Sequence, residues 1–468
     1  MKLNEFTNHN SDIDICGLSA DSREIKKGYL FASLNDDKFI IDAINNGAVA
    51  IITNNECKID IPQNIQIIRS VNPAKDFALA AAKFYGGQPN HVAAITGTNG
   101  KTSIADFIRQ ILTMMNYRAA SNGTIGLIKG NNPPIPSPNT TPVSVVLQKE
   151  LKEIADDGYD WLAIEASSHG LCQYRLGGLK VNVAGFTNLT RDHLDYHLNM
   201  ENYLNAKLIL FKDNLADDGV AVLNADISEF EAIRQACGNK KTISYGYKGK
   251  ELKLLKLTPL PQGQKMEIEY FGKYISFETP LAGEFQAMNI LCALGMVAEL
   301  TQRHQEVIAY ANKIRGAKGR LELVGQTASG AAIYIDYAHT PDALENVIKA
   351  LRPHTQNKLK VLFGCGGNRD SGKRPIMGKI ANDLADEVYV TDDNPRFEDP
   401  TPIREQIMAA CPKGINIANR ADAIKQAIQS LENGDILILA GKGHETGQYV
   451  MGEVLPFSDH EEVLKNIQ

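Results

Sequence analysis

The stretch that most constrains the fold is residues 92–103, which read VAAITGTNGKTS. An apolar run typical of a buried strand enters a short glycine-containing turn, and helix-like residues 104–115 follow. Strand, glycine loop and helix in this order present backbone N–H groups and the positive end of a helix to an anion. Lys101 can reach the β- and γ-phosphates of a nucleotide, and the Thr102 hydroxyl can hold Mg²⁺. The stretch therefore predicts an ATP phosphate site.

This loop is a tighter variant of the common phosphate-binding pattern. The pattern G-x-x-x-x-G-K-[ST] would place a glycine at position 95, where Ile95 stands, and the glycine is Gly97 instead. The alternative is a glycine-rich turn that carries a lysine by accident. The strand-like and helix-like residues on either side favour the phosphate site.

Size and composition indicate a multidomain globular enzyme. A chain of 468 residues predicts roughly three domains. The net charge of −6 provides no basic field, so nucleic acid is not an expected partner. No run of eighteen apolar residues exists and the first residues lack a signal-peptide core, so we expect neither membrane insertion nor secretion. The seven cysteines are scattered without a C-x-x-C pair, which fits reduced thiols in the cytoplasm.

The order of apolar runs predicts an α/β fold in three segments. Residues 1–88 alternate short strands and helices, and Gly-Gly-Gln-Pro at 86–89 marks a boundary. Residues 89–318 begin with the phosphate loop. In residues 319–468, four strands end in polar or glycine-rich loops with helices between them, which is typical of an open parallel sheet with its site along one edge. These four strands are expected at residues 332–336, 360–363, 387–391 and 435–439.

Two strands of the middle segment end in chemically active side chains. Residues 161–165 read as a buried parallel strand whose last residue, Glu165, falls where a nucleotide metal needs an oxygen ligand. Residues 181–186 form a second run, and two histidines and two aspartates follow it. A single histidine there would most often be structural, but such a cluster favours a functional role. Its members are Asp192, His193, Asp195 and His197.

Lys207 stands among apolar neighbours in a stretch with helical periodicity, residues 201–212. A lysine on an apolar helix face usually extends its ammonium group to solvent. The alternative is a functional lysine with a lowered pKa or an altered charge. The residues alone leave both interpretations open.

Five motifs together resemble the Mur ligases, and within them the branch that adds the third residue of the peptidoglycan stem peptide. They are GTNGKT at 97–102, EASSHGL at 165–171, the TNL…DHLDYH stretch at 187–197, DYAHTPD at 336–342 and GKGHE at 441–445. The resemblance covers nearly the whole chain in order. It implies a small α/β domain binding the UDP-sugar (1–88), a central P-loop ATPase-type domain with a parallel sheet (89–318) and a Rossmann-like amino-acid-binding domain (319–468).

The resemblance also implies a reaction. Such enzymes use ATP to join meso-2,6-diaminopimelate to the D-Glu γ-carboxylate of UDP-MurNAc-L-Ala-D-Glu through an acyl phosphate, in peptidoglycan precursor synthesis. A carboxylate is a poor electrophile, and both the phosphoryl transfer and the later tetrahedral intermediate concentrate negative charge. Lysine and Mg²⁺ suit that charge better than a protein nucleophile does. We expect a monomeric cytoplasmic ligase with no nucleic-acid or membrane partner.

Catalytic roles fall, by resemblance, on Lys101, Glu165, His193 and Lys207. Thr102 and Glu165 would hold one Mg²⁺, and Glu165, His193 and an N-carbamylated Lys207 would serve a second metal. The expected ATP-binding residues are Gly97, Thr98, Asn99, Gly100, Lys101, Thr102, Ser103, Asn289, Arg320, Asp336 and His339. The expected UDP-sugar-binding residues are Ser22, Asn139, Thr140, Thr141, Ser167, Gln173 and Arg175.

The choice of amino acid is expected in the last segment. The run DNPR at 393–396 resembles the signature of diaminopimelate enzymes, and a guanidinium can bind the second carboxylate of that substrate in a bidentate manner. An acidic residue such as Glu445 suits the distal ammonium group. The expected diaminopimelate-binding residues are Arg369, Asp393, Asn394, Pro395, Arg396, Gly441 and Glu445.

Three other functions compete with this one. A lysine-adding ligase of the same family would lack Arg396. A folylpolyglutamate synthase shares the ATP half but lacks the DNPR loop and the sugar-nucleotide domain. If the chain were a nucleotide-dependent regulatory module without ligase activity, His193 and Lys207 would have no role.

Against the family pattern, the loop at 34–39 is short and lacks the usual Asp-Gly, so its uridine contacts are not assigned. Gln286 and Asn368 replace the more common Asn and Asp.

Overall fold

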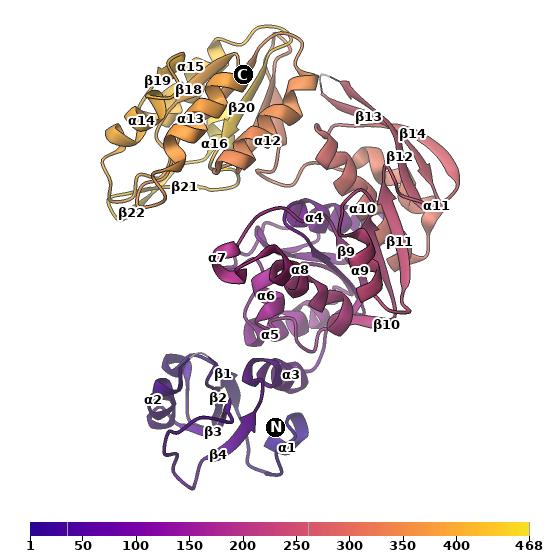
Figure 1. Ribbon diagram of the computed structural model, residues 1–468, viewed down its shortest axis with the longest axis vertical. Coiled ribbons are helices and arrows are strands. Elements are labelled where there is room, and N and C mark those ends of the chain that lie inside the picture. The colour runs from indigo at the N-terminus through magenta and orange to yellow at the C-terminus, as the bar shows by residue number, and fades with distance from the viewer. Residues whose placement is uncertain (35, 261, 468) are drawn as a thin grey trace. The chain divides into compact units, whose positions relative to one another are not determined.

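The computed structural model describes residues 1–34, 36–260 and 262–467. They pack into two compact units (Figure 1). The first unit comprises Met1–Ser244 and Gly295–His304, and the second comprises Tyr245–Leu294 and Gln305–Gln468. The division into three segments remains a prediction. No helix in the described residues combines the length and apolar character needed to cross a bilayer.

The first unit begins with a four-stranded parallel sheet in the order β1-β2-β3-β4. Leu30 and Ala32 face one core with Phe77 of α3, whereas Phe31 between them faces a second core. Because successive side chains of a strand point to opposite faces, the sheet is buried on both sides. The elements are α1 (Leu3–Phe6), β1 (Gly17–Ser19), β2 (Tyr29–Ala32), α2 (Ile40–Asn45), β3 (Ala48–Asn54), β4 (Gln66–Ser70) and α3 (Pro73–Tyr85).

A larger sheet in the same unit has the order β11-β10-β9-β5-β8-β6-β7. The strand β5 lies between β9 and β8, parallel to both, and every residue from Val92 to Thr96 is buried. The strands are β5 (His91–Thr96), β6 (Ala119–Gly123), β7 (Gly126–Lys129), β8 (Trp161–Glu165), β9 (Val181–Phe186), β10 (Leu215–Asn224) and β11 (Lys241–Gly246). The helices are α4 (Lys101–Met114), α5 (Ser144–Asp156), α6 (Ser168–Cys172), α7 (Leu194–His197), α8 (Met200–Ile209) and α9 (Phe230–Ala236).

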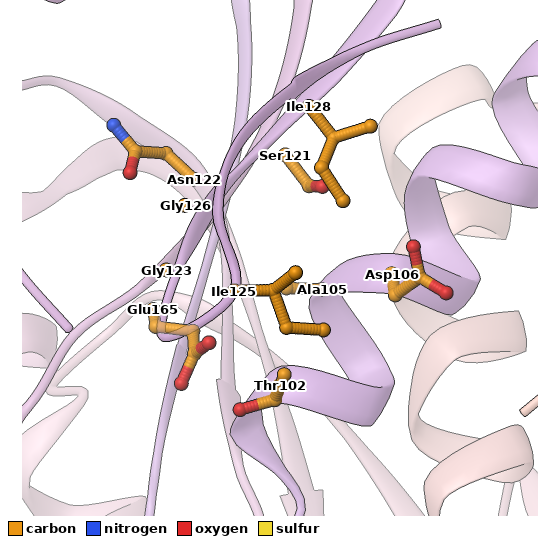
Figure 2. Close-up of a pocket in the computed structure, with 10 residues that line it drawn as sticks. All are labelled: Thr102, Ala105, Asp106, Ser121, Asn122, Gly123, Ile125, Gly126, Ile128 and Glu165. Carbon is orange, nitrogen blue, oxygen red and sulfur yellow. The ribbon is translucent and has the colours of Figure 1, made fainter. Parts of the chain in front are cut away.

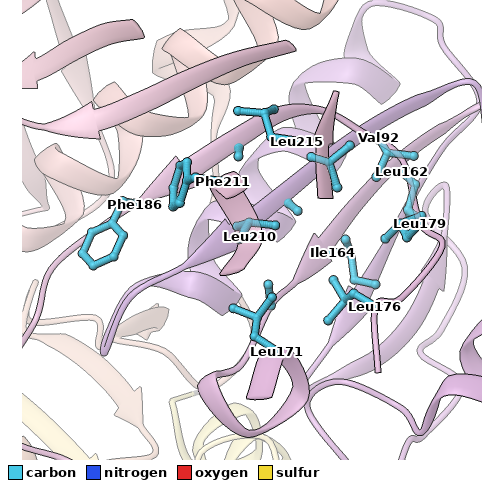
Figure 3. Close-up of a cluster of buried hydrophobic side chains, with 14 of the residues drawn as sticks. Val92, Leu162, Ile164, Leu171, Leu176, Leu179, Phe186, Leu210, Phe211 and Leu215 are labelled. Atoms are coloured by element: carbon cyan, nitrogen blue, oxygen red, sulfur yellow. The ribbon is translucent and has the colours of Figure 1, made fainter. Parts of the chain in front are cut away.

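Apolar side chains of β5 to β10 pack with those of α5, α6, α8 and α9 in one core (Figure 3). Val92, Leu162 and Ile164 from the strands pack with Leu171 of α6 and with Phe211. Phe211 belongs to a π-helical turn, Leu210–Asn214, which follows α8. The single helix predicted over 201–212 therefore ends early, at Ile209, and gives way to this wider turn. This core fixes the carboxyl ends of β5, β8 and β9, where the predicted site residues follow.

The second unit begins with a group of antiparallel strands. Three antiparallel strands, β12 (Leu252–Leu260), β13 (Gly263–Tyr270) and β14 (Lys273–Thr279), follow one another, and the last residues of β11 pair with β12. Helix α10 (Glu284–Thr301) begins in the second unit and ends in the first, and the short α11 (His304–Val307) follows it.

The rest of the second unit is a six-stranded sheet in the order β15-β16-β20-β17-β18-β19. The four predicted strands are β16, β17, β18 and β20, and they are parallel to one another. The elements are β15 (Glu322–Gln326), β16 (Ala332–Asp336), α12 (Pro341–Leu351), β17 (Leu359–Phe363), α13 (Lys373–Leu384), β18 (Glu387–Val390), α14 (Pro400–Met408), β19 (Gly414–Asn416), α15 (Arg420–Gln429), β20 (Ile436–Ala440), β21 (Gly447–Val450), β22 (Glu453–Pro456) and α16 (Asp459–Asn466).

Helices cover both faces of this sheet. Val361 and Phe363 face a core built with α12, α13 and α14, whereas Leu362 faces a core built with α15 and α16. This arrangement explains why the strands read as continuous apolar runs, as parallel strands buried on both faces do. The open parallel sheet predicted for this segment is confirmed, and the antiparallel edge strand β15 is an addition that the sequence did not indicate.

Candidate active site

The predicted phosphate loop joins β5 to α4 directly. Gly97 and Gly100 have φ angles of +135° and +91°, and α4 begins at Lys101. A Cβ atom at position 97 would lie 1.9 Å from Thr187 Oγ1, at the end of β9. The Thr187 hydroxyl donates to the Asn99 carbonyl oxygen at 2.6 Å. Only glycine fits here, and the loop is held tightly against the neighbouring strand end.

Lys101 and Lys207 meet at one backbone oxygen of this loop. Lys101 Nζ donates to the carbonyl oxygens of Gly97 and Thr98, at 2.9 and 2.7 Å. Lys207 Nζ donates to the Gly97 carbonyl oxygen at 2.9 Å. Two side chains predicted for catalysis therefore converge beside the phosphate loop, although they are far apart in the sequence.

The burial of Lys207 excludes the interpretation in which its ammonium group extends to solvent. Its side chain is 1% exposed, so the ammonium group does not extend to solvent. Burial, reinforced by the positive charge of Lys101, lowers the pKa of Lys207 well below its usual range, and Asp192 opposes this shift. A lysine with a lowered pKa carries more of the neutral amine, which is the nucleophilic form.

Thr102 and Glu165 line one pocket at the start of α4 (Figure 2). Glu165 is the last residue of β8 and is 1% exposed. Its Oε1 accepts a hydrogen bond from the Thr124 backbone N–H at 2.8 Å, and its Oε2 accepts one from the Thr124 hydroxyl at 3.2 Å. A hydroxyl and a carboxylate beside a phosphate loop are hard oxygen donors, and they fit Mg²⁺ in the presence of a nucleotide.

Sequence reasoning missed the residues that hold Glu165 in place. Thr124 fixes both carboxylate oxygens, and a Cβ atom at Gly123 would lie 2.1 Å from Glu165 Oε1. The available signal was the sequence Asn-Gly-Thr at 122–124, where β6 ends and a short turn leads into β7. Such turns are common, so the spacing alone does not connect this one with Glu165.

The loops after β8 and β9 bring three histidines together. The ring of His169 lies 4.8 Å from that of His193 and 5.4 Å from that of His197, between centroids. Tyr203 of α8 lies 5.2 Å from His197, and Lys207 Nζ lies 4.2 Å from the Tyr203 ring. His193 is half exposed, whereas His197 is 4% exposed. His193 and His197 of the predicted cluster therefore lie together at this sheet edge, with His169 as an added member.

The described residues contain no group of three His, Cys, Asp or Glu side chains placed to hold a metal ion. The second metal expected from Glu165, His193 and Lys207 depends on a lysine that offers an oxygen only after carbamylation. The second metal site therefore remains a prediction.

Residues predicted for the UDP-sugar form a chain of hydrogen bonds that ends at Glu165. The Thr141 hydroxyl donates to the Glu165 carbonyl oxygen at 2.8 Å and contacts Ser167 Oγ at 3.0 Å. Arg175 donates to the Thr141 carbonyl oxygen at 2.7 Å and to Gln173 Oε1 at 2.8 and 3.0 Å.

The other three predicted UDP-sugar residues lie around or outside this network. Thr140 joins it through Thr124, with their hydroxyl oxygens 3.1 Å apart. Asn139 precedes it in a turn closed by the Ser137 hydroxyl. Ser22 lies elsewhere in the first unit, beside the first sheet, where its carbonyl oxygen accepts a hydrogen bond from Asn46. Asn35, in the short loop that left uridine unassigned, lies outside the described residues.

The second unit brings together the residues predicted for adenine and ribose. Asp336 ends β16 and accepts hydrogen bonds from the backbone N–H groups of Leu321 and Ala338, at 2.6 and 2.7 Å. Burial raises the pKa of Asp336 to about 6, and the charge of Arg320 opposes this shift. Both Arg320 and His339 lie against Tyr337: the guanidinium is 5.1 Å from its ring, and His339 Nδ1 is 2.8 Å from its carbonyl oxygen.

Asn289 joins this group through a residue that departs from the family pattern. Asn289 Nδ2 donates to Gln286 Oε1 at 3.1 Å, and Gln286 Nε2 donates to the Arg320 carbonyl oxygen at 3.3 Å. Gln286 thus links α10 to the turn before β15 within the second unit.

The predicted amino-acid residues follow β17, β18 and β20 at one edge of their sheet. Asn394 Nδ2 donates to Glu445 Oε2 at 2.9 Å, which joins two of the loops. A Cβ atom at Gly441 would lie 2.6 Å from Asp393 Oδ2, so only glycine allows this approach. Burial raises the pKa of Asp393, and Arg420 and Lys442 oppose this shift.

Arg396 connects these loops to the third one. Its backbone has a φ angle of +57°, and Nη1 donates to the Gly367 carbonyl oxygen at 2.9 Å. Gly367 itself is packed under Pro395, whose carbonyl oxygen would lie 2.0 Å from a Cβ atom there. Arg369 follows in the same turn and is exposed. Sequence reasoning also missed the hairpin β21–β22, in which Val450 forms a bridge with Arg396.

Comparisons with known proteins identify the family of this chain. The Mur ligase middle domain model matches residues 95–297, and the Mur ligase glutamate ligase domain model matches residues 319–443. A UDP-N-acetylmuramoyl-L-alanyl-D-glutamate–2,6-diaminopimelate ligase of Caulobacter vibrioides is 43% identical across 98% of this chain and 96% of its own length. The protein of the same name from Bradyrhizobium diazoefficiens is 45% identical across 96% of this chain and 94% of its own length.

Solved structures give the same relationship. A structure of a UDP-N-acetylmuramoyl-L-alanyl-D-glutamate–2,6-diaminopimelate ligase superposes with a TM-score of 0.72 at 33% identity, over 97% of this chain and 94% of that one. The MurF ligase of Thermotoga maritima in complex with ADP has a TM-score of 0.61 at 18% identity, over 97% of each chain, which is a likeness of fold alone. Motifs, folds and full-length identity thus agree, and this chain belongs to the Mur ligase family.

Proposed function

We propose that this chain is an ATP-dependent ligase that joins meso-2,6-diaminopimelate to the D-Glu γ-carboxylate of UDP-MurNAc-L-Ala-D-Glu in peptidoglycan precursor synthesis. The observation that carries the proposal is the full-length similarity, at 43–45% identity, to relatives named as ligases of these two substrates. The joined loops of Asn394, Arg396 and Glu445 support the choice of amino acid.

The first half of the reaction activates the acceptor. The Gly97–Gly100 loop and the N-terminus of α4 bind the phosphates of ATP, and Lys101 offsets the charge that develops on the γ-phosphoryl group. The acceptor carboxylate attacks the γ-phosphorus, ADP leaves and an acyl phosphate forms. Mg²⁺ held by Thr102 and Glu165 would supply further positive charge to the phosphates.

The second half forms the amide. The amine of the amino acid attacks the acyl carbon, the tetrahedral intermediate collapses, and inorganic phosphate leaves. The hydrogen-bonded chain from Arg175 through Thr141 to Glu165 supports binding of the acceptor beside this site. Water must be excluded from an acyl phosphate, since hydrolysis would waste it.

Lys207 is proposed to act as a carbamate. Its lowered pKa favours the neutral amine, which can add to CO₂ and release one proton. The product is an anionic, carboxylate-like group at the end of a buried side chain. With His193 and Glu165 it would serve a second metal, and its negative charge would sit next to Lys101.

The amino-acid loops recognise a substrate with two carboxylates and two ammonium groups. Arg396 would bind the distal carboxylate in a bidentate manner, and Glu445 would accept hydrogen bonds from the distal ammonium group. Arg369, Asp393, Asn394 and Gly441 complete this proposed site. Asn289, Arg320, Asp336 and His339 are proposed to bind the adenosine part of ATP. We propose a monomer that acts in the cytoplasm, where ATP is made.

Phosphate release tests the function. The protein receives ATP, Mg²⁺, the UDP-linked dipeptide and one amino acid at a time, and we expect turnover with meso-diaminopimelate. L-Lysine should be used far more slowly, because it lacks the second carboxylate. Faster turnover with L-lysine would reject the proposed specificity. Turnover with a folate in place of the UDP-linked dipeptide would reject the acceptor.

A further inference from the structure

Lys442 is a buried lysine next to the amino-acid loops, and no role was predicted for it. Its side chain is 0% exposed. Its ammonium group donates to Gly447 O at 2.7 Å, to Glu445 Oε2 at 3.1 Å and to Asn394 Oδ1 at 3.2 Å. An ammonium group has three protons, so these three acceptors use its whole capacity. Lys442 therefore has no proton left for a ligand and can act only through its partners.

The partners of Lys442 are the side chains that would face the amino acid. Asn394 Oδ1 also accepts from the Tyr449 backbone N–H at 3.0 Å, so two donors fix which end of this amide carries the oxygen. The other end, Nδ2, then points at Glu445 Oε2. Because Oε2 is shared by the donors of Lys442 and Asn394, a ligand ammonium group would meet Glu445 Oε1.

The hairpin β21–β22 adds further hydrogen bonds to the DNPR loop, residues 393–396. Gln448 Nε2 donates to the Asp393 carbonyl oxygen at 2.6 Å, and the Arg396 backbone N–H donates to the Tyr449 carbonyl oxygen at 2.9 Å. Lys442 ties the start of the hairpin, at Gly447, to the same loop. Without it, the loop and the hairpin would keep their backbone contacts but lose the charged link that orients Asn394 and Glu445.

We propose that Lys442 is a positioning residue for the incoming diamino acid: it fixes the orientation of Asn394 and Glu445 so that their remaining polar atoms meet the substrate. This inference rests on the proposed function. A merely structural lysine would stabilise the fold without affecting one substrate more than another.

Lys360 provides the matched control for a structural role. It is 2% exposed and donates to Ser430 Oγ at 3.0 Å, with Glu387 and Asp435 carboxylates at 3.3 Å. It belongs to the same unit but stands near the start of β17, whereas the amino-acid loops follow the carboxyl ends of the strands. Both lysines are buried and donate to several acceptors. The acceptors of Lys442 are proposed to meet the substrate, whereas those of Lys360 are not.

Steady-state kinetics of the full-length protein test the inference. We expect Lys442→Met to raise the KM for diaminopimelate about tenfold or more, the loss typical of a charged hydrogen bond, while the KM values for ATP and the UDP-linked dipeptide change less than about twofold. Lys360→Met should leave all three KM values unchanged. Should Lys442→Met fail to fold, Lys442→Gln, which keeps two donors, should show a smaller rise in the same KM.

A double mutant separates action through Glu445 from independent action. Because Lys442 is proposed to act through Glu445 and Asn394, combining Lys442→Met with Glu445→Gln should raise the diaminopimelate KM by clearly less than the product of the two single effects. Additive effects, an unchanged diaminopimelate KM or an equal rise in all three KM values would overturn the inference. If the wild-type protein ligates another amino acid, the proposed function fails, and the same comparison with that amino acid still decides the role of Lys442.

Discussion

At the scale of single residues, the phosphate loop lies beside two lysines whose positive charges are close together, which is energetically unfavourable. Lys101 and Lys207 donate to the same carbonyl oxygen, and the charge of Lys101 disfavours the charged form of Lys207. Two buried or half-buried cations so close together are unfavourable in a folded protein unless a negative group joins them. A nucleotide phosphate would add a negative group beside Lys101. A carbamate on Lys207 would both remove one cation and supply an anion.

Lys207→Ala tests the carbamate. We expect activity to fall by roughly two orders of magnitude or more, because an anionic group next to the phosphates is lost. Acetate or formate should restore part of this activity, because a short carboxylate can occupy the space of the missing group. The measurement is phosphate release with increasing concentrations of each anion.

The exposed Lys212, five residues further on, provides the control. Lys212→Ala should keep full activity and respond to neither anion. If Lys207→Ala loses activity and no short carboxylate restores any of it, the carbamate assignment is wrong.

Single residues also mark the limit of prediction from sequence. The predicted groups were found by residue type at strand ends, which is how Glu165 and the histidine cluster were identified. Thr124 and Lys442 were missed because their contacts are with other side chains of the protein, and the distance in sequence from Thr124 to Glu165 carries no signal. Their roles become visible only when hydrogen-bond partners are known.

At the scale of elements, buried parallel strands were the easiest to predict. The runs 161–165, 181–186 and 332–336 coincide with β8, β9 and β16, because strands buried on both faces are continuously apolar and end at polar loops. Helix ends were harder. The turn Leu210–Asn214 keeps helical periodicity but widens to π geometry, and nothing in its composition distinguishes it from an α-helix.

Gly97→Ala tests whether the phosphate loop depends on its contact with β9. A methyl group there would meet Thr187 Oγ1 at 1.9 Å, and the φ angle of +135° is unfavourable for alanine. We expect the affinity for ATP to fall at least about tenfold, because the loop must shift away from its phosphate-binding shape. Isothermal titration with ATP and Mg²⁺ measures this change.

Gly238→Ala is the matched control for Gly97→Ala. Gly238 also has a positive φ, +60°, but nothing lies within 4 Å of a Cβ atom there. This variant should lose about 1 kcal/mol of stability and keep its affinity for ATP. Equal ATP affinity in Gly97→Ala and wild type would contradict the proposed role of the loop.

At the scale of the whole molecule, a net negative protein is proposed to bind three anionic or zwitterionic substrates. With 49 Lys and Arg against 55 Asp and Glu, the net charge is −6, so long-range attraction does not favour them. Binding must therefore come from a few locally placed cations. In the first unit the proposed cations are Lys101 and Arg175, and in the second they are Arg320 and Arg396. The proposed binding of all three substrates thus depends on cations that backbone or side-chain contacts hold in place.

Arg396→Ala tests the substrate choice of the complete reaction. Loss of a bidentate guanidinium–carboxylate contact should raise the KM for diaminopimelate by roughly ten- to a hundredfold, while ATP and the UDP-linked dipeptide keep their KM values. The KM for L-lysine, which has no second carboxylate, should change little, so the ratio of kcat/KM values for the two amino acids should fall. Arg352, which forms an exposed ion pair with Asp386 in the same unit, gives the control, and Arg352→Ala should leave the ratio unchanged. If Arg396→Ala lowers kcat/KM equally for both amino acids, Arg396 maintains the loop through its contact with Gly367, and the choice of diaminopimelate must come from another cation.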